Sequence, residues 1–145
     1  AYSSANIIDI YVLEKASDLQ LRRATPEYKT SLLDAMNVKK MLTDELIIVD
    51  GLIRTLDLVV TMRIDRESKR RSPEIMGLVQ DAVFNYFFVD NREFGQDFIL
   101  QDLVRFIHEI ELVRFITIDN LSNDVNIEHN EIIQLNNLTI NTVVI

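Results

Sequence analysis

The sequence contains no cysteine among its 145 residues, which excludes disulfide bonds and thiolate metal sites from this chain. Glycine and proline are also scarce, with three and two residues, while hydrophobic residues make up 48%. Disordered chains have the opposite composition, because they cannot bury enough apolar surface to offset the entropy of ordering. The composition therefore predicts a globular protein, either one domain or two small lobes that share one core.

Basic residues are outnumbered, since 15 Lys and Arg stand against 23 Asp and Glu and leave a formal net charge of −8. A general nucleic-acid binder is normally basic, so we expect no nucleic-acid partner. No apolar run approaches the ~20 residues that a transmembrane helix needs, so we expect no membrane partner. The first residues, AYSSANIIDIYV, lack a basic segment and a cleavage pattern and do not predict a signal peptide.

The clearest pattern lies in residues 53–89, where strand spacing is followed by helical spacing. Apolar and polar residues alternate over residues 54–65, as in a strand with one buried face. The apolar set is Leu56, Leu58, Val60, Met62 and Ile64. At ~3.3 Å per residue this strand should span ~40 Å and overhang the ~25 Å helix that follows it.

The helix is predicted over residues 73–89. Ser72 would supply its N-cap, and Pro73 is a proline in the first turn. The residues at helical spacing are Ile75, Leu78, Val79, Ala82, Val83, Tyr86 and Phe87. A long strand that leads into a long helix predicts a layer in which the helix covers the strand.

A turn is predicted immediately before the long strand. Residues 45–49 (ELIIV) have the composition of a short buried strand, and Asp50-Gly51 is the strongest hairpin signal in the chain. Two-residue hairpin turns require positive φ, which glycine adopts without steric cost. We therefore expect a hairpin that pairs residues 46–49 with the long strand.

The other segments predict shorter elements. Residues 6–14 favour a strand, and Thr25-Pro26 begins a helix that runs to about Met41. A short helix is expected over residues 101–109, followed by a strand over 112–118. Residues 120–130 are rich in asparagine and predict a loop, and the segments 132–135 and 138–145 have a β-branched bias.

This order of elements predicts an α+β fold, a split βαβ (ferredoxin-like) mixed sheet with helices on one face. The chain would form a single domain with its core at about residues 44–118. Residues 119–145 would be a β-rich C-terminal extension of that core.

No segment carries catalytic, cofactor-binding or metal-binding residues at a suitable spacing. His108 and His129 are the only histidines, and a site built from His108 and Glu111 would be two ligands short. Acidic residues also surround the short helix: Asp97, Asp102, Glu109 and Glu111. They could do acid–base work, but solvation and the helix dipole explain them more simply. We therefore expect no enzyme, no cofactor and no metal.

A basic loop stands out in this acidic chain, and it contains Arg66, Lys69, Arg70 and Arg71. The loop could grip phosphate or RNA, pair with an acidic neighbour in an assembly, or simply be solvated. No interleaved aromatic residues support nucleic acid. Phe88 falls outside the apolar stripe of the long helix and is a candidate anchor for a partner, whereas Tyr86 and Phe87 favour core packing.

The chain ends in an apolar segment whose β-branched aliphatic residues are Ile140, Val143, Val144 and Ile145. A strand of this composition must be covered by its own sheet or by a neighbouring subunit through strand addition. Because the Asn-rich segment separates it from the main layer, we expect it to pair with a neighbour. Together with Phe88 and the basic loop, it would form the interface.

The middle of the chain has a characteristic order of segments. They are LIIVDG at 46–51, LDLVVTMRID at 56–65, a helix ending NYFF at 85–88, Phe94-Gly95 before LQDLVRFIHEI at 100–110, and a strand at 112–118. This order resembles the C-terminal part of the baseplate J-like family, the wedge proteins of contractile-tailed phages. The likeness covers roughly residues 44–118, with Glu111-Leu112 where the family often has Gly-Val.

The resemblance implies a structural subunit, or a fragment of one, in the baseplate wedge of a contractile tail. Such a protein would be made in the host cytoplasm, reside in the virion, form a homo-oligomer such as a dimer and pack with other baseplate subunits. The alternative is a small-molecule binding module or small enzyme, since a ferredoxin-like layer hosts many functions. A pocket with convergent polar groups would favour the alternative, and a large apolar patch would favour the structural role.

Overall fold

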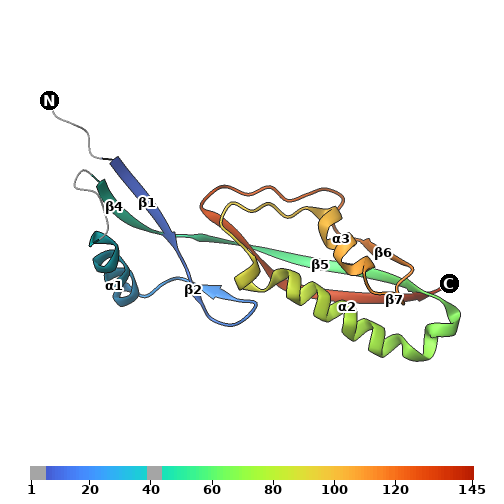
Figure 1. Cartoon of the computed structure of the whole chain (residues 1–145). Coiled ribbons are helices and arrows are strands. Elements are labelled where there is room, and N and C mark those ends of the chain that lie inside the picture. Colours follow the sequence, from blue (N-terminus) through green and yellow to red (C-terminus); the bar gives the residue numbers. More distant parts are fainter. Residues whose placement is uncertain (1–5, 39–43) are drawn as a thin grey trace.

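The computed structural model describes residues 6–38 and 44–145 and has the α+β composition that the sequence predicts. The molecule is elongated (Figure 1), with β1, α1 and β4 at one end and β5, β7 and α2 along the rest of its length. The strands are β1 (Asn6–Val12), β2 (Glu14–Lys15), β3 (Leu21–Arg22), β4 (Asp44–Asp50), β5 (Leu52–Ile64), β6 (Phe115–Ile118) and β7 (Glu131–Val144). The helices are α1 (Pro26–Asn37), α2 (Ser72–Phe87) and α3 (Leu100–His108), with 3-10 turns η1 (Arg66–Arg71) and η2 (Val89–Asn91).

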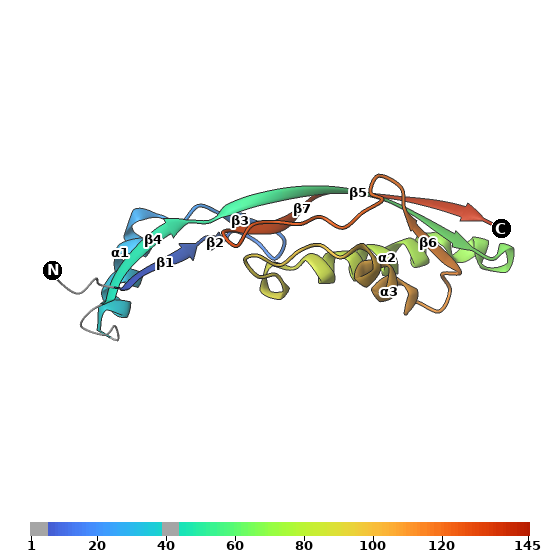
Figure 2. The same ribbon diagram turned by 90° about the horizontal axis from the view of Figure 1, so that it is seen from above.

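Strands β4 and β5 form one extended run that exchanges its neighbour at Gly51 (Figure 2). Strand β4 pairs in parallel with β1, whereas β5 pairs in parallel with β7 and antiparallel with β6. At the exchange, the Gly51 amide donates to the Val12 carbonyl at 3.0 Å, and the Leu52 amide donates to the Asn130 carbonyl at 3.0 Å. The main chain therefore stays hydrogen-bonded while it passes from one sheet to the other.

The prediction of a hairpin at Asp50-Gly51 is wrong. The chain continues in nearly the same direction, and Gly51 does not have the positive φ that a primed turn needs. Glycine at position 51 instead allows the Phe94 ring to lie close to the main chain. A Cβ on Gly51 would overlap that ring and lie 3.3 Å from Leu13 Cδ1. Asp-Gly predicted a hairpin because glycine adopts the positive φ of a primed turn. Here glycine is needed because it has no side chain, and the sequence does not distinguish these two roles.

The larger sheet has the strand order β6-β5-β7, and both α2 and α3 lie on one side of it (Figure 2). The face predicted to be buried on β5 is confirmed, since Leu58, Val60, Met62 and Ile64 are all at most 1% exposed. These side chains pack with Ile75, Val79, Val83 and Phe87 of α2 and with Leu103 and Ile107 of α3. Leu78 was expected on the covered face of α2 but is exposed.

The predicted overhang of the strand is also present. Full burial on β5 begins at Leu58, and residues before it are half-buried or exposed. The first half of β5 therefore extends past the helical layer toward β4, with β7 alongside it (Figure 1).

The C-terminal segment is part of the main sheet, so the expectation that it pairs with a neighbouring subunit is wrong. Strand β7 pairs with β5 from Leu52↔Glu131 to Ile64↔Val144, and Ile133 and Leu135 belong to the core. The register shifts once, at Asn136, whose side-chain amide donates to Asp57 at 3.1 Å. The Asn-rich loop does not separate the segment from the sheet; it carries the chain back along β5, so that parallel pairing becomes possible.

The two predicted helix starts have different outcomes. Thr25 is the N-cap of α1 as expected, and its hydroxyl accepts from the Tyr28 amide at 3.2 Å. Ser72 does not cap α2, because its hydroxyl donates to the Lys69 carbonyl at 2.7 Å and η1 leads directly into the helix. The predicted end of α1 near Met41 lies outside the described residues.

The two glycines in extended and helical positions predict opposite effects of alanine. Gly51→Ala should lower the free energy of unfolding by about 1–3 kcal/mol, because the new Cβ displaces the Phe94 ring. Gly77→Ala should raise it by about 0.5–1 kcal/mol, since Gly77 is inside α2 and nothing beyond its own stretch of helix backbone lies within 4 Å of the added Cβ. Urea denaturation followed by circular dichroism measures both. A Gly51→Ala chain as stable as the parent would contradict the close approach at Phe94.

The two hydroxyl residues give a second matched pair. Thr25→Ala should destabilise α1 by about 1 kcal/mol, because the Tyr28 amide loses its acceptor. Ser72→Ala should have a smaller effect on α2, since no helix amide loses an acceptor there. Amide hydrogen exchange in each helix is the measurement, and equal effects in the two helices would contradict this assignment.

Candidate functional site

The end of the molecule formed by β1, α1 and β4 has little core of its own, and we call it the N-terminal lobe. Helix α1 has no buried residue, and exposed aliphatic side chains on the two strands include Ile7, Ile8 and Ile47. A sheet of parallel strands is normally covered on both faces. The described residues place a single helix against this pair of strands, so apolar surface remains exposed at this end of the molecule.

Ion pairs and hydrogen bonds hold α1 to the strands. The ammonium group of Lys29 lies 2.6 Å from the Asp50 carboxylate, and this contact lowers the pKa of Asp50 below its usual value. The Thr25 amide donates to the Glu14 carboxylate at 3.1 Å and lowers the pKa of Glu14 in the same way. Both carboxyl groups are therefore held in their charged form. The charged form is the one that pairs with Lys29 and accepts from the Thr25 amide, so it helps to attach α1 to the strands.

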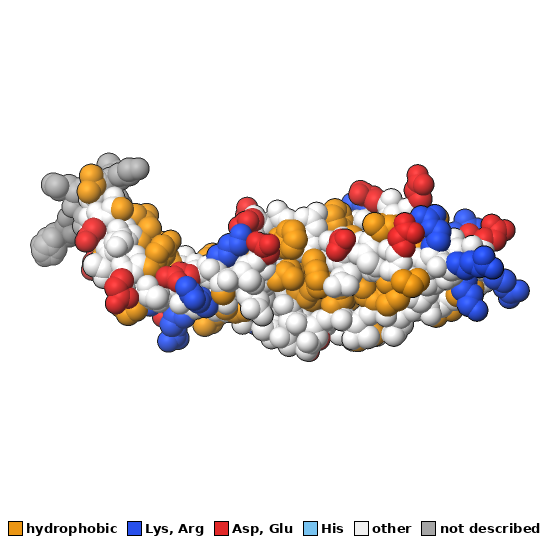
Figure 3. All heavy atoms as spheres, turned by 90° about the horizontal axis from the view of Figure 1, so that it is seen from below, with side chains coloured by type: hydrophobic (Ala, Val, Ile, Leu, Met, Phe, Trp, Pro, Cys, Tyr) orange, Lys and Arg blue, Asp and Glu red, His pale blue; other side chains and the backbone are white. Residues whose placement is uncertain are grey.

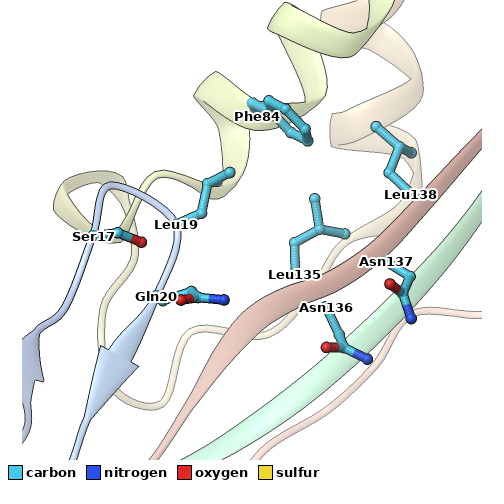
Figure 4. A pocket seen from close by; sticks show the side chains of 8 residues that line it. All are labelled: Ser17, Leu19, Gln20, Phe84, Leu135, Asn136, Asn137 and Leu138. Carbon is cyan, nitrogen blue, oxygen red and sulfur yellow. The ribbon is translucent and has the colours of Figure 1, made fainter.

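A groove runs beside β7 on the side of α2. Its wider part is a hollow of about 420 Å³ between the loop of the β2–β3 hairpin, α2 and β7 (Figure 4). This hollow is lined by Ser17, Leu19, Gln20, Phe84, Leu135, Asn136, Asn137 and Leu138. A second hollow of about 220 Å³ continues along β7 and is lined by Met76, Gln80, Phe84, Leu138 and Ile140. Because Phe84 and Leu138 line both hollows, we treat them as one groove, the β7 groove.

The hairpin closes one end of the β7 groove. The Leu21 amide donates to the side-chain carbonyl of Gln134 on β7 at 2.7 Å, and the Val89 amide donates to the Asp18 carbonyl at 2.8 Å. Lys15 forms an ion pair with Asp90 at 3.0 Å. The hairpin is thus bonded to β7 and to the η2 turn that follows α2.

The far end of β7 lies beside η1, where the predicted basic loop is located. Val144 pairs with Ile64, and the Ile145 amide donates to the Ile64 carbonyl at 3.0 Å, two residues before Arg66. The four basic residues do not share one environment, since Arg71 forms a bidentate pair with Glu74 at 2.9 and 3.0 Å. This pair raises the pKa of Arg71 and lowers the pKa of Glu74.

The other three basic residues, Arg66, Lys69 and Arg70, are exposed and take part in none of the ion pairs of the described residues. We call this group the basic tip. Figure 3 shows Lys and Arg side chains gathered at this end of the molecule, with a band of hydrophobic side chains along the part next to it. Arg114, another nearby cation, is paired with Asp65 at 3.2 Å.

The residues predicted as an interface are partly brought together. Ile140 lines the β7 groove, and Val143, Val144 and Ile145, which line neither hollow, are exposed at the end of β7 beside the basic tip. Phe88 is half-buried where α2 ends, far along the helix from η1, and is not part of this surface. Phe84 and Leu138 were not singled out by sequence reasoning; the absence of charge on β7 after Glu131 is a signal that could have found Leu138.

Two of the candidate acid–base and metal residues, His129 and Asp97, have hydrogen-bond partners within the fold. His129 Nε2 and the Tyr11 hydroxyl are joined by a hydrogen bond of 3.0 Å, and Asp97 accepts from the Ile127 amide at 2.9 Å. Asp102 lies in the first turn of α3, where the helix dipole favours it, and His108 is exposed at the end of that helix. Within residues 6–38 and 44–145, no three His, Asp or Glu side chains are grouped as a metal site would require.

Comparison with protein-family models and with curated protein sequences finds no match for this chain. Among the helices that the structure describes, none has the length and apolar character needed to cross a membrane.

The bidentate pair at the edge of the basic tip can be tested by titration. Arg71→Gln should raise the pKa of Glu74 toward its usual value, because the guanidinium that stabilises the carboxylate is removed. A lowered pKa means that the pair contributes stability above that pKa and loses it as the pH falls through it. Carboxyl chemical shifts measured by NMR during a pH titration report this. Arg66→Gln is the matched control and should leave the Glu74 titration unchanged; a Glu74 pKa insensitive to Arg71→Gln would contradict the pairing.

Proposed function

We propose that this chain is a structural interaction protein that works by packing with other polypeptides, and that it belongs to the baseplate wedge of a contractile phage tail. The observation that carries the first part is the apolar surface of the N-terminal lobe. Ile7 and Ile47, which are 64% and 39% exposed, lie on one face of a parallel pair of strands, and Ile8, which is 40% exposed, lies on the other face. Exposed apolar surface on a sheet of this kind is typical of a contact with another polypeptide.

The second part of the proposal rests on the resemblance to the baseplate J-like family. The order of elements from β4 to β6 agrees with the order on which that resemblance depends. Helix α2 ends at Tyr86-Phe87, and Gly95, with a φ of +74°, comes between α2 and α3. A side chain at Gly95 would be strained by this φ, and its Cβ would lie 3.2 Å from the His129 Cα. The glycine of the family's order is thus required by the backbone here.

We also propose that the fold is related to the split βαβ (ferredoxin-like) arrangement, which the mixed sheet with helices on one face supports. The fold departs from that arrangement in one respect. Its parallel strands β5 and β7 are direct neighbours, whereas a split βαβ has another strand between its parallel strands. The role proposed here requires only the mixed layer, with surfaces that a dimer or other baseplate subunits would cover.

A small-molecule binding module is the second candidate, and the wider part of the β7 groove favours it. Its volume of about 420 Å³ is within the range of ligand sites, and amide side chains from Gln20, Asn136 and Asn137 line it. No titratable side chain is part of that lining, which favours binding over acid–base catalysis. The structural role is preferred because it also accounts for the exposed aliphatic residues of the N-terminal lobe.

The structural role predicts self-association through the N-terminal lobe. Ile7→Glu and Ile47→Glu together should shift the purified chain to a smaller sedimenting species across a concentration series, since charge cannot be buried in an apolar contact. Leu78→Glu, an exposed apolar residue on α2, is the control for the change of charge. A parent chain that sediments as a monomer at every concentration would refute the self-association.

The baseplate assignment needs a separate measurement. Contractile-tailed particles purified from the culture that encodes this chain should contain its tryptic peptides, and these should remain with the tails after the heads are removed. Expression of the chain in infected cells without its presence in tails would exclude the assignment. A full-length chain that binds a small molecule in the β7 groove and forms no assembly would favour the second candidate.

A further inference from the structure

Strand β7 is the edge of its sheet on the side opposite β5. In the strand order β6-β5-β7 it has a single neighbour among the described residues. On an edge strand, main-chain amide and carbonyl groups of alternate residues point away from the sheet and remain available to another strand. Strand β7 therefore presents a regular row of donors and acceptors over much of its length.

This edge lacks the features that normally prevent pairing. Edge strands are usually protected by charged residues, proline, bulges or short length. Strand β7 has 14 residues, and Glu131 at its start is its one charged residue. It contains no proline, and its single irregularity is at Asn136, so the register is regular from Asn137 to Val144.

The β7 groove lies directly beside this edge. Leu138 and Ile140 of the strand face Met76 and Phe84 of α2 across it. A strand added to the edge of a sheet projects alternate side chains to one side, where apolar positions in a groove can receive them. The row of main-chain groups and the groove together fit an extended polypeptide, whereas a bound helix would leave the edge of β7 unpaired.

The basic tip adds a preference of charge at one end. Arg66, Lys69 and Arg70 are exposed beside the end of β7 in a chain with a net charge of −8. A second copy of β7 would not neutralise them, because its one acidic residue, Glu131, is 8% exposed and paired with Arg54 at 3.4 Å. The complementary occupant is a segment with acidic residues at the end that meets the basic tip.

We propose that the edge of β7 and the β7 groove accept an extended segment of a different protein, apolar at alternate positions and acidic where it meets the basic tip. The inference rests on the proposed role as an interaction protein and adds the chemistry of one partner. It also reverses the role expected from the sequence, in which the C-terminal segment was donated to a neighbour; here β7 stays in its own sheet and receives a strand.

The test uses the full chain and a fluorescent peptide, Asp-Asp-Thr-Val-Thr-Ile-Thr-Val, together with the reversed sequence so that both strand directions are sampled. Binding measured by anisotropy and mapped by NMR should perturb amide groups of β7 from Asn137 to Val144. A matched peptide with two lysines in place of the aspartates should bind about tenfold more weakly or worse. N-methylation at the alternate residues that face β7 should abolish binding, whereas N-methylation of the intervening residues should not.

Variants of the protein separate the charge from the edge. Arg66→Glu with Lys69→Glu should weaken binding of the acidic peptide by about tenfold or more and strengthen binding of the lysine peptide. Arg105→Glu makes the same type of charge change at an exposed position on α3 and should leave binding unchanged. Phe84→Ala should weaken both peptides equally, because it alters the groove and not the charge.

Several outcomes would overturn the proposal: no binding of either peptide direction at about 1 mM, equal binding of the acidic and lysine peptides, or amide shifts confined to other elements. Release of a second copy on addition of peptide, seen as a smaller sedimenting species, would assign the edge to a homodimer and also overturn it. Failure of peptide binding in a chain found in phage tails would defeat this inference alone. Peptide binding by a chain absent from tails would defeat only the baseplate assignment.

Discussion

The structure depends on one extended run of main chain, β4 followed by β5, that must find hydrogen-bonding partners along its whole length. Unpaired main-chain groups are costly when they are removed from water, so each half of the run needs a neighbouring strand. Strand β1 serves the first half, and β7, with a short contribution from β6, serves the second. The exchange occurs at Gly51, where the absence of a side chain makes room for Phe94 between the two sheets.

The two halves of this run are buried to very different extents. The main core consists of side chains from β5, β6, β7, α2 and α3 and the segments that join them. In the N-terminal lobe, Val12 and Ala24 are buried, while α1 is attached largely through ion pairs and hydrogen bonds. Regions with few buried apolar contacts open most easily, so the N-terminal lobe is expected to be the less stable part. Low local stability is typical of a region whose apolar surface is covered only when a partner binds.

Strand β7 links the fold to the proposed partner. Its pairing with β5 is what brings Leu138 and Ile140 opposite α2 and ends the strand at the basic tip. The same pairing leaves its second edge without a neighbour among the described residues. An uncharged edge beside an apolar groove is a hazard for an isolated chain, because any exposed strand could pair with it. In an assembly the same edge provides a specific place for one partner, and the charge of the basic tip adds discrimination.

The alternation of Leu58, Val60, Met62 and Ile64 and the helical spacing of Ile75, Val79 and Val83 determined β5 and α2, because one buried face imposes a period on the sequence. Thr25 likewise determined the start of α1, since a helix cap is a contact within three residues. Tertiary structure alone decided that β4 pairs with β1 and that β7 pairs with β5. Strand pairing is made by main-chain groups that every residue carries, so the sequence of a strand specifies its faces but not its neighbour. For that reason the sequence showed that residues 138–145 needed covering, and only the fold showed which edge of that strand is still open.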